Sequence, residues 1–429
     1  MTTFPLAFLS RYERDADLMH DVAVKAQPLF QKYTFEKRGT EAVAERFVLS
    51  GPRGSAKTLA EAQSISALRK NSNYFRFLVP QGEYNGSILI PHKDIAQSEA
   101  DPEAGAKALE DNVDRGTANV AAQFIQLMLG PAGGNVGTAT FNAAASGAFL
   151  TFCLRFVSVP SAARLQEGDH VVISTADGSG SSDVTVGSTG VVIDRDIDNG
   201  YVRIAATTDT GTAANPGGWD DTGATTYYVF RLSELAAGDG SDIVVPWASY
   251  VPPTRQTSTL LGVDRSSDSA LSGARLLSTE SKGTLSSRAK KLVSKMRARL
   301  GTDANRVGRR QSLVLYAEEW ATFEEELTAR LLREPETKTR DGYEAFVIGT
   351  VMGELDVISE PYMQQGYGRI ISTSMCRLIT TNGKLMRIVH EDGNIISRMP
   401  NSNDMEMRPV IYAAHVVGPP HAHGIFPTA

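Results

Sequence analysis

The sequence predicts an α+β protein, in which helices and strands occupy separate stretches of the chain. One long helix with clear start and stop signals covers residues 101–131. A segment rich in Gly, Thr, Ser, Val and Asp follows at 140–247, and residues 351–429 again alternate as strands. No repeating strand–helix pattern supports a parallel sheet.

The long helix is the element around which the other segments are organised. Asp101 is a good N-cap, Pro102 suits the first helical position, and Gly130 followed by Pro131 is a stop signal. One apolar stripe runs along it, formed by Leu109, Val113, Val120, Phe124 and Leu127. These limits predict a helix of roughly 28 residues, about 42 Å long. A glycine inside a helix costs about 1 kcal/mol relative to alanine, so Gly105 and Gly116 predict close packing against another backbone.

The N-terminal third predicts two projecting segments. Residues 1–50 mix helix-forming sequence with scattered charge, which favours an extended or loosely helical arm rather than part of a core. Tyr74–Pro91 predicts a long β-hairpin, because YFRFLVP and SILIP flank turn residues at 82–86. Nothing nearby in sequence offers this hairpin a core, so we expect it to reach another chain. The alternative is an edge hairpin folded on its own domain.

Residues 140–247 predict a small all-β barrel or sandwich, with turn signals between short strands. The strand candidates are GAFLTFCLRFVSV, DHVVIS, GVVIDRD, GYVRIA and TTYYVFRL. Residues 160–247 carry four Arg against thirteen Asp or Glu, and this acidity favours a solvent-facing insertion that does not touch nucleic acid. Asp194–Gly200 (DRDIDNG) resembles a calcium loop, but its glycine comes one place late and Ala205 replaces the bidentate Glu. Asn199-Gly200 instead predicts a hairpin turn.

Residues 254–350 predict an α/β layer that carries both signs of charge. Thr284–Leu300 predicts a helix with an apolar arc of about 100°. The arc consists of Leu285, Ala289, Leu292, Val293, Met296 and Leu300. The remaining surface of this helix is basic, which is equally consistent with contact to DNA phosphates or an acidic neighbour and with a solvated face. The stretch SLVLYAEEWATFEEELTARLL predicts a buried strand followed by an acidic helix.

The last segment predicts antiparallel strands, with Asn382-Gly383 as a hairpin turn. His415, His421 and His423 are candidate metal ligands. Three histidines without a carboxylate are weak evidence for a metal site, and the Pro, Gly and His content favours a surface tail.

Composition limits the classes of function. The chain has 429 residues, 41 % of them hydrophobic, which is enough for two or three domains with real cores. A net charge of −6 argues against a general nucleic-acid binder. Cys153 and Cys376 are the only cysteines, so we expect no disulfide framework and no zinc site. No apolar run approaches the roughly 18 residues of a membrane span, and we expect a cytoplasmic protein without a signal peptide.

Catalytic motifs are weak. The stretch Gly51–Thr58 (GPRGSAKT) approaches a phosphate-binding P-loop, with Gly51, Lys57 and Thr58 at the right spacing. Ala56 replaces the glycine that must precede the lysine, and no convincing acidic strand for a magnesium ion follows. A glycine-rich turn before a helix is the simpler interpretation. We assign no catalytic, cofactor-binding or metal-binding residues and expect no enzyme activity.

The order of these parts resembles the major capsid proteins of tailed bacteriophages with the Hong Kong 97-type fold. The resemblance is carried by the hairpin Tyr74–Pro91, the helix Pro102–Leu129, TLLGVDRSSDSALSGAR, SLVLYAEEWATFEEEL and SEPYMQQGYGRIISTSMCRLITTNG. RLQEGDHVVIS and GVVIDRDIDNGYVRIA are similar to the small barrel that some of these proteins insert after the spine helix. The resemblance covers nearly the whole chain as an ordering of elements, without a sharp signature.

The resemblance implies a division of the chain into six parts. These are an N-terminal arm and helix at 1–71, an extended loop at 72–100, the spine helix of a peripheral domain at 101–139, the inserted barrel at 140–247, an axial α/β domain at 248–350, and peripheral-domain strands with the C-terminal tail at 351–429. The spine helix begins near residue 102, which leaves no room for a fused scaffolding region and implies a separate scaffolding protein.

The implied function is a structural shell protein, forming hexamers and pentamers of an icosahedral capsid around packaged double-stranded DNA. The implied partners are other copies of the chain, a scaffolding protein, a portal and a decoration protein, with no membrane. The implied location is the virion, after assembly in the bacterial cytoplasm. Two alternatives stay open, namely a nucleotide-binding enzyme that uses Gly51–Thr58 and a virion surface protein that binds through the barrel.

Overall fold

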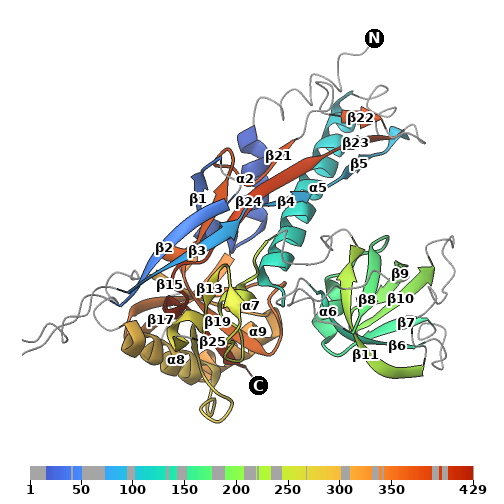
Figure 1. Cartoon of the computed structure of the whole chain (residues 1–429). Coiled ribbons are helices and arrows are strands. Elements are labelled where there is room, and N and C mark those ends of the chain that lie inside the picture. The colour runs from blue at the N-terminus through green and yellow to red at the C-terminus, as the bar shows by residue number, and fades with distance from the viewer. Residues whose placement is uncertain are drawn as a thin grey trace, which may run out of the picture.

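The chain folds into an elongated upper body, a lower sheet and a separate barrel (Figure 1). The computed structural model describes residues 16–39, 42–50, 73–93, 102–131, 135–142, 152–175, 189–206, 219, 222–232, 244–266, 268–300, 310–330, 338–340, 343–388, 396–398 and 404–428. Helix α5 (Pro102–Leu129) runs through the upper body. Helices α8 (Leu285–Leu300) and α9 (Ala317–Arg330) pack against the lower sheet. The predicted α+β class is confirmed.

Helix α5 has the 28 residues that its capping signals and periodicity predict. From Val120 to its end the helix is almost entirely buried, including Phe124, Ile125 and Met128, and Val113 is buried about two turns earlier. At Gly116 an added Cβ would lie 2.7 Å from the side chain of Ile88, so the predicted close approach exists. The neighbour is a side chain rather than the backbone we expected.

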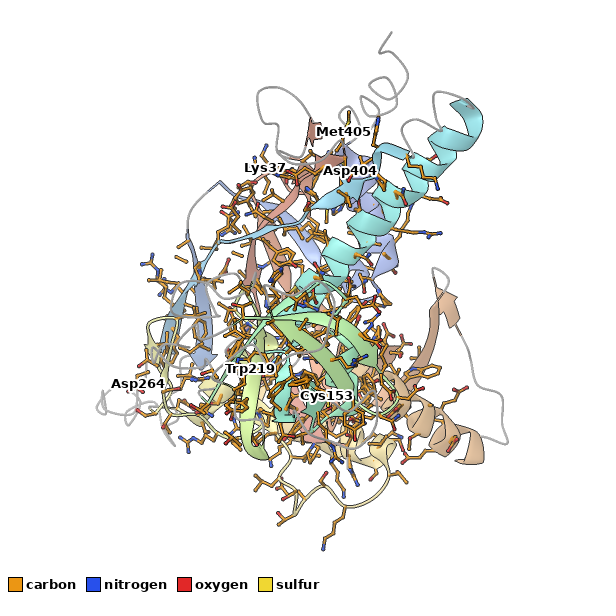
Figure 2. All side chains as sticks on the ribbon, turned by 90° about the vertical axis from the view of Figure 1, so that its right-hand side faces the viewer. Lys37, Cys153, Trp219, Asp264, Asp404 and Met405 are labelled. Atoms are coloured by element: carbon orange, nitrogen blue, oxygen red, sulfur yellow. The ribbon has the colours of Figure 1, made fainter. Side chains whose placement is uncertain are left out.

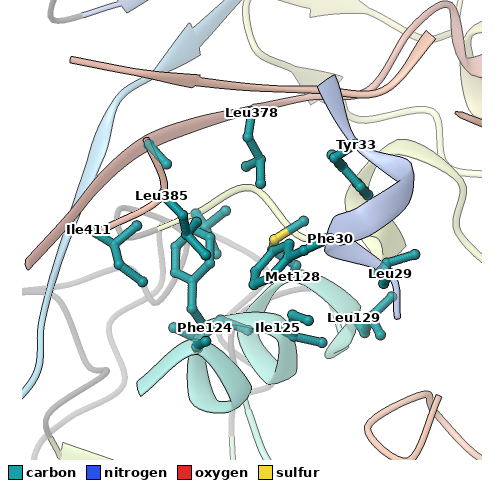
Figure 3. Packing of buried hydrophobic residues seen from close by; sticks show 14 of the residues in the cluster. Leu29, Phe30, Tyr33, Phe124, Ile125, Met128, Leu129, Leu378, Leu385 and Ile411 are labelled. Atoms are coloured by element: carbon teal, nitrogen blue, oxygen red, sulfur yellow. The ribbon is translucent and has the colours of Figure 1, made fainter. Parts of the chain in front are cut away.

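Helix α5 packs against a five-stranded sheet. The sheet has the order β1-β20-β24-β21, and β4 also pairs with β24. Its strands are β1 (Thr34–Lys37), β20 (Arg377–Thr380), β24 (Pro409–Val416), β21 (Arg387–Ile388) and β4 (Gly82–Asn85). Figure 3 shows Phe124, Ile125 and Met128 of α5 facing Leu378 and Ile411 of the sheet. One core therefore joins three distant parts of the sequence.

The expectation of an N-terminal arm outside any core is wrong for residues 16–37. Helix α2 (Ala16–Ala26) packs along α5, and a 3₁₀ turn (Phe30–Lys32) leads into β1. Met19, Ala23, Leu29 and Phe30 are all buried in the main core (Figure 3). Their partners lie on α5 and on C-terminal strands, so no local sequence pattern reveals this burial.

The lower sheet has seven strands in the order β14-β25-β19-β15-β18-β17-β16. These are β14 (Ala274–Arg275), β25 (Gly424–Pro427), β19 (Tyr367–Ser372), β15 (Arg310–Leu315), β18 (Gly353–Ser359), β17 (Tyr343–Thr350) and β16 (Lys338–Arg340). Helices α8 and α9 share a hydrophobic core with one face of this sheet, where Leu292 and Phe323 meet Leu313 and Ile370. All six predicted apolar residues of α8 are buried.

The inserted segment is a closed barrel with the strand order β10-β7-β6-β11-β8-β9. Its strands are β6 (Gly137–Asn142), β7 (Cys153–Phe156), β8 (His170–Ser174), β9 (Gly190–Asp196), β10 (Tyr201–Ala206) and β11 (Thr222–Arg231), with the short helix α6 (Val159–Ala163). The barrel has its own core, in which Trp219 meets Phe141 edge to face at 5.0 Å. Figure 2 labels Trp219 and Cys153 in this part. Closure excludes the sandwich alternative, and β6 starts slightly before residue 140.

The predicted hairpin Tyr74–Pro91 is wrong. Strand β3 (Asn73–Pro80) pairs with β2 (Ala42–Ser50), not with the residues that follow it. Strand β4 pairs with β24, and β5 (Ile88–Ile90) joins β23 (Met405–Met407) and β22 (Ile396–Arg398). The turn residues at 82–86 therefore redirect the chain between sheets instead of closing a hairpin.

Two C-terminal predictions are also wrong. Asn382-Gly383 does not close a hairpin, because β20 and β21 both pair with β24 and not with each other. The C-terminal segment is not a surface tail, because His421 and His423 are buried and β25 lies inside the lower sheet. The short remaining elements are α7 (Trp247–Tyr250), β12 (Thr259–Leu260), β13 (Val263–Asp264) and 3₁₀ turns at Ser269–Ser272, Thr373–Met375 and Pro420–Ala422.

Candidate assembly interface

Strands β2 and β3 form a two-stranded antiparallel ribbon that extends beside the upper body (Figure 1). The register runs from Ala42 opposite Pro80 to Ser50 opposite Asn73. We call these two strands the ribbon. Because side chains alternate between the two faces of a strand, the ribbon has one face toward its own chain and one away from it.

The inner face of the ribbon is apolar and packed. Val43, Phe77 and Val79 are buried against Ile379 and Val416 of the five-stranded sheet and against Val263 and Leu271. Phe77 also meets Tyr250 edge to face, with ring centroids 6.3 Å apart. This contact fixes the base of the ribbon, which a two-stranded hairpin alone in water could not hold.

The outer face of the ribbon exposes apolar side chains. Tyr74 is 46 % exposed and Leu78 is 49 % exposed, and the guanidinium of Arg46 lies 3.9 Å from the Tyr74 ring centroid. Arg46 and Arg76 are directly opposite each other in the register, and like charges in such a pair are destabilising. An apolar face with uncompensated positive charge is the expected composition of a surface that another molecule covers.

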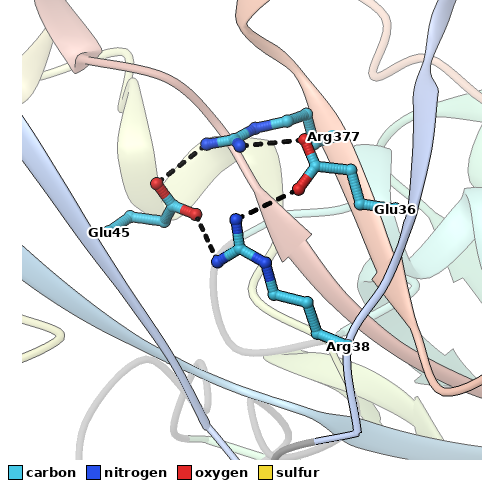
Figure 4. A network of polar contacts seen from close by, with 4 residues as sticks. All are labelled: Glu36, Arg38, Glu45 and Arg377. Carbon is cyan, nitrogen blue, oxygen red and sulfur yellow. Dashed lines mark hydrogen bonds and ion pairs between the residues drawn. The ribbon is translucent and has the colours of Figure 1, made fainter.

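A network of four charges anchors the ribbon at its base (Figure 4). Arg377 of β20 donates to Glu45 of β2 at 2.8 Å and to Glu36 of β1 at 3.0 Å. Arg38 completes the ring, 3.4 Å from Glu45 and 3.2 Å from Glu36. Burial opposes the charge of Arg377, but its bonds to Glu36 and Glu45 raise the pKa of Arg377 overall.

The sequence analysis did not identify this network. The sequence contains one indication of it. Glu45 lies two residues after Val43 and therefore on the same inner face of the strand, where an apolar residue is expected. Its partners come from β1 and from β20, more than three hundred residues later. Only the assembled sheet brings them together.

The P-loop-like stretch Gly51–Thr58 lies outside the described residues. The calcium-like loop Asp194–Gly200 forms the β9–β10 hairpin, which confirms the turn predicted at Asn199-Gly200. Asp196 accepts hydrogen bonds from the backbone and side-chain amides of Asn199 at 3.2 and 2.7 Å. Asp194 accepts from the backbone of Arg195 and lies 3.9 Å from Arg203. These carboxylates hold the turn and its flanking strands.

His415 belongs to a buried hydrogen-bond chain. Trp247 Nε1 donates to Tyr33 Oη at 2.7 Å, and Tyr33 lies 3.0 Å from His415 Nε2. His415 Nδ1 is 2.7 Å from the carbonyl of Val245, so it carries the proton and Nε2 accepts from Tyr33. Burial lowers the pKa of His415 to about 4. Among the residues that the structure describes, no three His, Cys, Asp or Glu side chains are grouped as metal ligands.

His423 has a similar structural position. Its Nδ1 accepts from the backbone N–H of Ser372 at 3.1 Å, and its ring lies 5.0 Å from that of Trp247. Burial, followed by the charges of His421 and His415, lowers the pKa of His423 to about 3. A neutral ring packed in this way contributes to the core.

The basic side of α8 is partly used within the chain. Arg288 donates to the carbonyls of Gly283, Pro427 and Thr428, and Lys295 pairs with Glu280 at 2.7 Å. These contacts hold neighbouring segments against the helix. None of the helices in the described part of the chain combines the length and apolar character that a membrane crossing requires.

No protein-family model and no curated protein matches this chain. Solved structures do match it. A chain of the cyanophage A-1(L) capsid asymmetric unit has a TM-score of 0.50 at 8 % identity, covering 93 % of this chain and 92 % of that one.

Two further matches have lower TM-scores. A chain of the satellite phage P4 procapsid, which includes the size determination protein Sid, reaches 0.43 at 9 % identity over 100 % and 98 % of the two chains. A chain from Mycobacterium phage Bobi reaches 0.39 at 8 % identity over 94 % and 90 %.

The cyanophage match extends over nearly the full length of both chains. The chain has the Hong Kong 97-type fold of tailed-bacteriophage major capsid proteins, with a six-stranded barrel inserted after the spine helix.

Proposed function

We propose that this protein is the major capsid protein of a tailed double-stranded DNA bacteriophage. Copies of the chain assemble as hexamers and pentamers into an icosahedral shell that encloses the genome. The observation that carries the proposal is the ribbon, whose base is fixed by a buried apolar face and four charges while its outer face exposes Tyr74 and Leu78.

A ribbon of this kind suits a subunit contact. Its base is held in place, so the direction in which the ribbon extends from the subunit is fixed. Its outer face provides apolar area that is costly to leave in water. In a closed ring the same contact recurs between every pair of neighbours, so a modest gain per contact is multiplied over the particle.

The proposal assigns a role to each part of the fold. Helix α5 and the five-stranded sheet form the peripheral domain, and the seven-stranded sheet with α8 and α9 forms the axial domain. Strands β18, β19 and β25 therefore belong to the axial domain and not to the predicted peripheral segment 351–429, and the barrel is an insertion. The extended loop, predicted at 72–100, is assigned instead to the ribbon strands at 42–50 and 73–80, because β3 pairs with β2. Other partners are a separate scaffolding protein, a portal, packaged DNA and a decoration protein. The chain works in the virion, after assembly in the bacterial cytoplasm, as a structural protein without enzyme activity.

The test is assembly of the purified full chain, alone and co-expressed with a candidate scaffolding protein. Sedimentation velocity and negative-stain microscopy should show capsomers or closed shells of megadalton mass. A compact monomer under every condition would contradict the proposal. ATP should not raise the melting temperature, and a magnesium-dependent ATPase lost in Lys57→Ala would favour the nucleotide-binding enzyme instead.

A further inference from the structure

Four arginines gather where the 249–276 segment meets the end of α8, and we call Arg255, Arg265, Arg275 and Arg299 the arginine cluster. Arg275 and Arg299 donate to the carbonyls of two consecutive residues, Ser272 and Gly273, at 2.9 and 2.6 Å. Arg265 donates to the carbonyls of Ser249 and Ser258.

The backbone next to Arg255 contacts the loop at Ser272 and Gly273. Ser272 Oγ donates to the carbonyl of Gln256 at 3.0 Å, so the residue next to Arg255 lies against the loop that Arg275 and Arg299 hold. Arg255 itself is exposed. The charges of Arg299, Arg255 and Arg265 all act on Arg275, so the four side chains lie near one another.

Among the residues that the structure describes, no carboxylate lies in salt-bridge distance of a member of the arginine cluster, and the neutral carbonyls that Arg265, Arg275 and Arg299 contact do not cancel their charge. Elsewhere in the chain, Arg377, Arg231 and Lys295 all have carboxylate partners. Arg275 is 8 % exposed, and its Nε has no hydrogen-bond partner. Burial, together with the charges of Arg299, Arg255 and Arg265, lowers the pKa of Arg275 to about 10.

Helix α9 presents the opposite charge. Glu318 and Glu325 are exposed and lie seven residues apart, so they share one helical face together with Thr322. The side chain of Glu318 accepts from Gln365 at 3.1 Å, and neither glutamate pairs with a cation. We call Glu318 and Glu325 the acidic stripe.

The two charged surfaces lie on different helices, because Arg299 is at the end of α8 and the acidic stripe is on α9. Two different patches of one subunit can join in a head-to-tail contact, which closes into a ring when the rotation between neighbours allows it.

We propose that the arginine cluster of one copy of this chain binds the acidic stripe on α9 of the next copy. The ligand class is a pair of carboxylates, which guanidinium groups bind in a planar, bidentate manner. This contact rests on the proposed capsid function and adds a specific electrostatic pairing between neighbours, separate from the ribbon. Within its own chain, bonds from Lys295 and Leu277, followed by the charges of Lys295 and Arg299, lower the pKa of Glu280, so Glu280 is one counter-charge, and the contact adds two more carboxylates.

The experiment reverses charge on each side. Arg299→Glu and Glu325→Arg, at two exposed positions, should each raise the concentration needed for half-assembly about tenfold, equivalent to about 1.4 kcal/mol per subunit. The double variant carries both reversals in every copy, so it restores opposite charges across the contact. It should return to within about threefold of the wild-type concentration.

Two matched controls keep the result specific. Lys290→Glu, at an exposed lysine on the same helix, and Glu354→Arg, at an exposed glutamate on β18, change the net charge equally and should leave assembly unchanged. Circular dichroism confirms that each variant is folded. If wild type does not assemble, the proposed function itself fails.

If wild type assembles and the double variant is no better than the single ones, this pairing is wrong although the capsid function stands. All assembly is measured on nuclease-treated protein. If Arg299→Glu leaves DNA-free assembly unchanged but lowers the DNA retained by particles, the cluster binds phosphates and the carboxylate proposal is overturned.

Discussion

Glu360 shows how burial alone can set the charge of a side chain. Glu360 directly follows β18 in the sequence, and its side chain is fully buried. Among the described residues, no donor lies in hydrogen-bonding position to either of its carboxylate oxygens. Burial raises the pKa of Glu360 to about 8, and the backbone at Tyr362 offsets only part of this effect. The neutral acid is therefore the form that the folded chain holds at pH 7.

This burial predicts a pH-dependent stability. The pKa of a free glutamate is about 4.3, so between about pH 4 and pH 8 the folded state binds the proton that the unfolded state has released. The free energy of unfolding therefore falls as the pH rises through this window. Glu360→Gln removes the titrating carboxyl group and with it this loss of stability at high pH. The substitution should raise the melting temperature at pH 8 by several degrees, with little change at pH 4.5.

Thermal denaturation at both pH values measures the effect, with Glu354→Gln at an exposed position as the control. Each variant is compared with wild type at the same pH, so the opposite contribution of the buried histidines cancels. An equal shift at pH 4.5 and pH 8 would show that packing, not protonation, is responsible.

The network at the base of the ribbon predicts a coupled pair of substitutions. Arg377→Ala leaves the buried Glu45 without its shortest partner and should cost roughly 1–3 kcal/mol of unfolding free energy. Adding Glu45→Gln removes the uncompensated charge, so the double variant should lose less than the sum of the single losses. Strictly additive losses in chemical denaturation would show that Arg377 and Glu45 act independently.

At the scale of elements, two adjacent residues of the ribbon have different predicted roles. One contributes to the stability of the subunit, and the other contributes to assembly. Leu78 points outward and is half exposed, whereas Phe77 points inward and is fully buried. Leu78→Asp should change the stability of the free subunit by no more than about 0.5 kcal/mol, yet reduce shell formation steeply. Phe77→Asp is the matched control and should destabilise the subunit itself by at least about 3 kcal/mol.

Denaturation of the free subunit and sedimentation under assembly conditions give both quantities. Normal particles from Leu78→Asp would mean that the outer face of the ribbon is not a subunit contact.

Gly116 in the spine helix tests whether close packing or intrinsic helix propensity decides the effect of a substitution. Replacing Gly116 with alanine gains about 1 kcal/mol of helix propensity, but the new methyl group would meet Ile88 at 2.7 Å. Overpacking of this kind costs typically 1–3 kcal/mol, so Gly116→Ala should be neutral to destabilising by about 2 kcal/mol. Combining it with Ile88→Ala should remove the clash and recover part of that loss in chemical denaturation. A clear gain in stability from Gly116→Ala alone would contradict the close approach.

At the scale of the whole molecule, the barrel is the part most separate from the rest. It closes on itself and has its own core. Polar side-chain contacts link the barrel to the body, such as Arg231 to Gln126 at 2.8 Å and Arg164 to the carbonyl of Tyr362 at 2.9 Å.

Residues 135–232 should therefore fold alone, with β-type circular dichroism and a cooperative thermal transition. Arg231→Ala in the full chain should loosen the link to α5 and Asp169 without unfolding the barrel. A disordered fragment would show that the barrel needs the body to fold.

The sequence predicted the elements better than it predicted the candidate interface. The limits of α5, the buried arc of α8, the barrel strands and the Asn199-Gly200 turn all follow from signals within a few residues of one another. The ribbon was assigned to the wrong partner, and the charges that anchor it were missed. Turn residues at 82–86 and at Asn382-Gly383 look like hairpin signals, yet each directs the chain to a distant strand.

By itself, the sequence determined where helices and strands form, because capping, side-chain periodicity and turn geometry act over a few residues. Only the tertiary structure decided which strands pair: β1 with β20, β2 with β3, and β4 with β24. The physical reason is that backbone donors and acceptors are the same in every strand. The choice of partner depends on which apolar faces α5 and the sheets bury together, and that is a property of the whole chain.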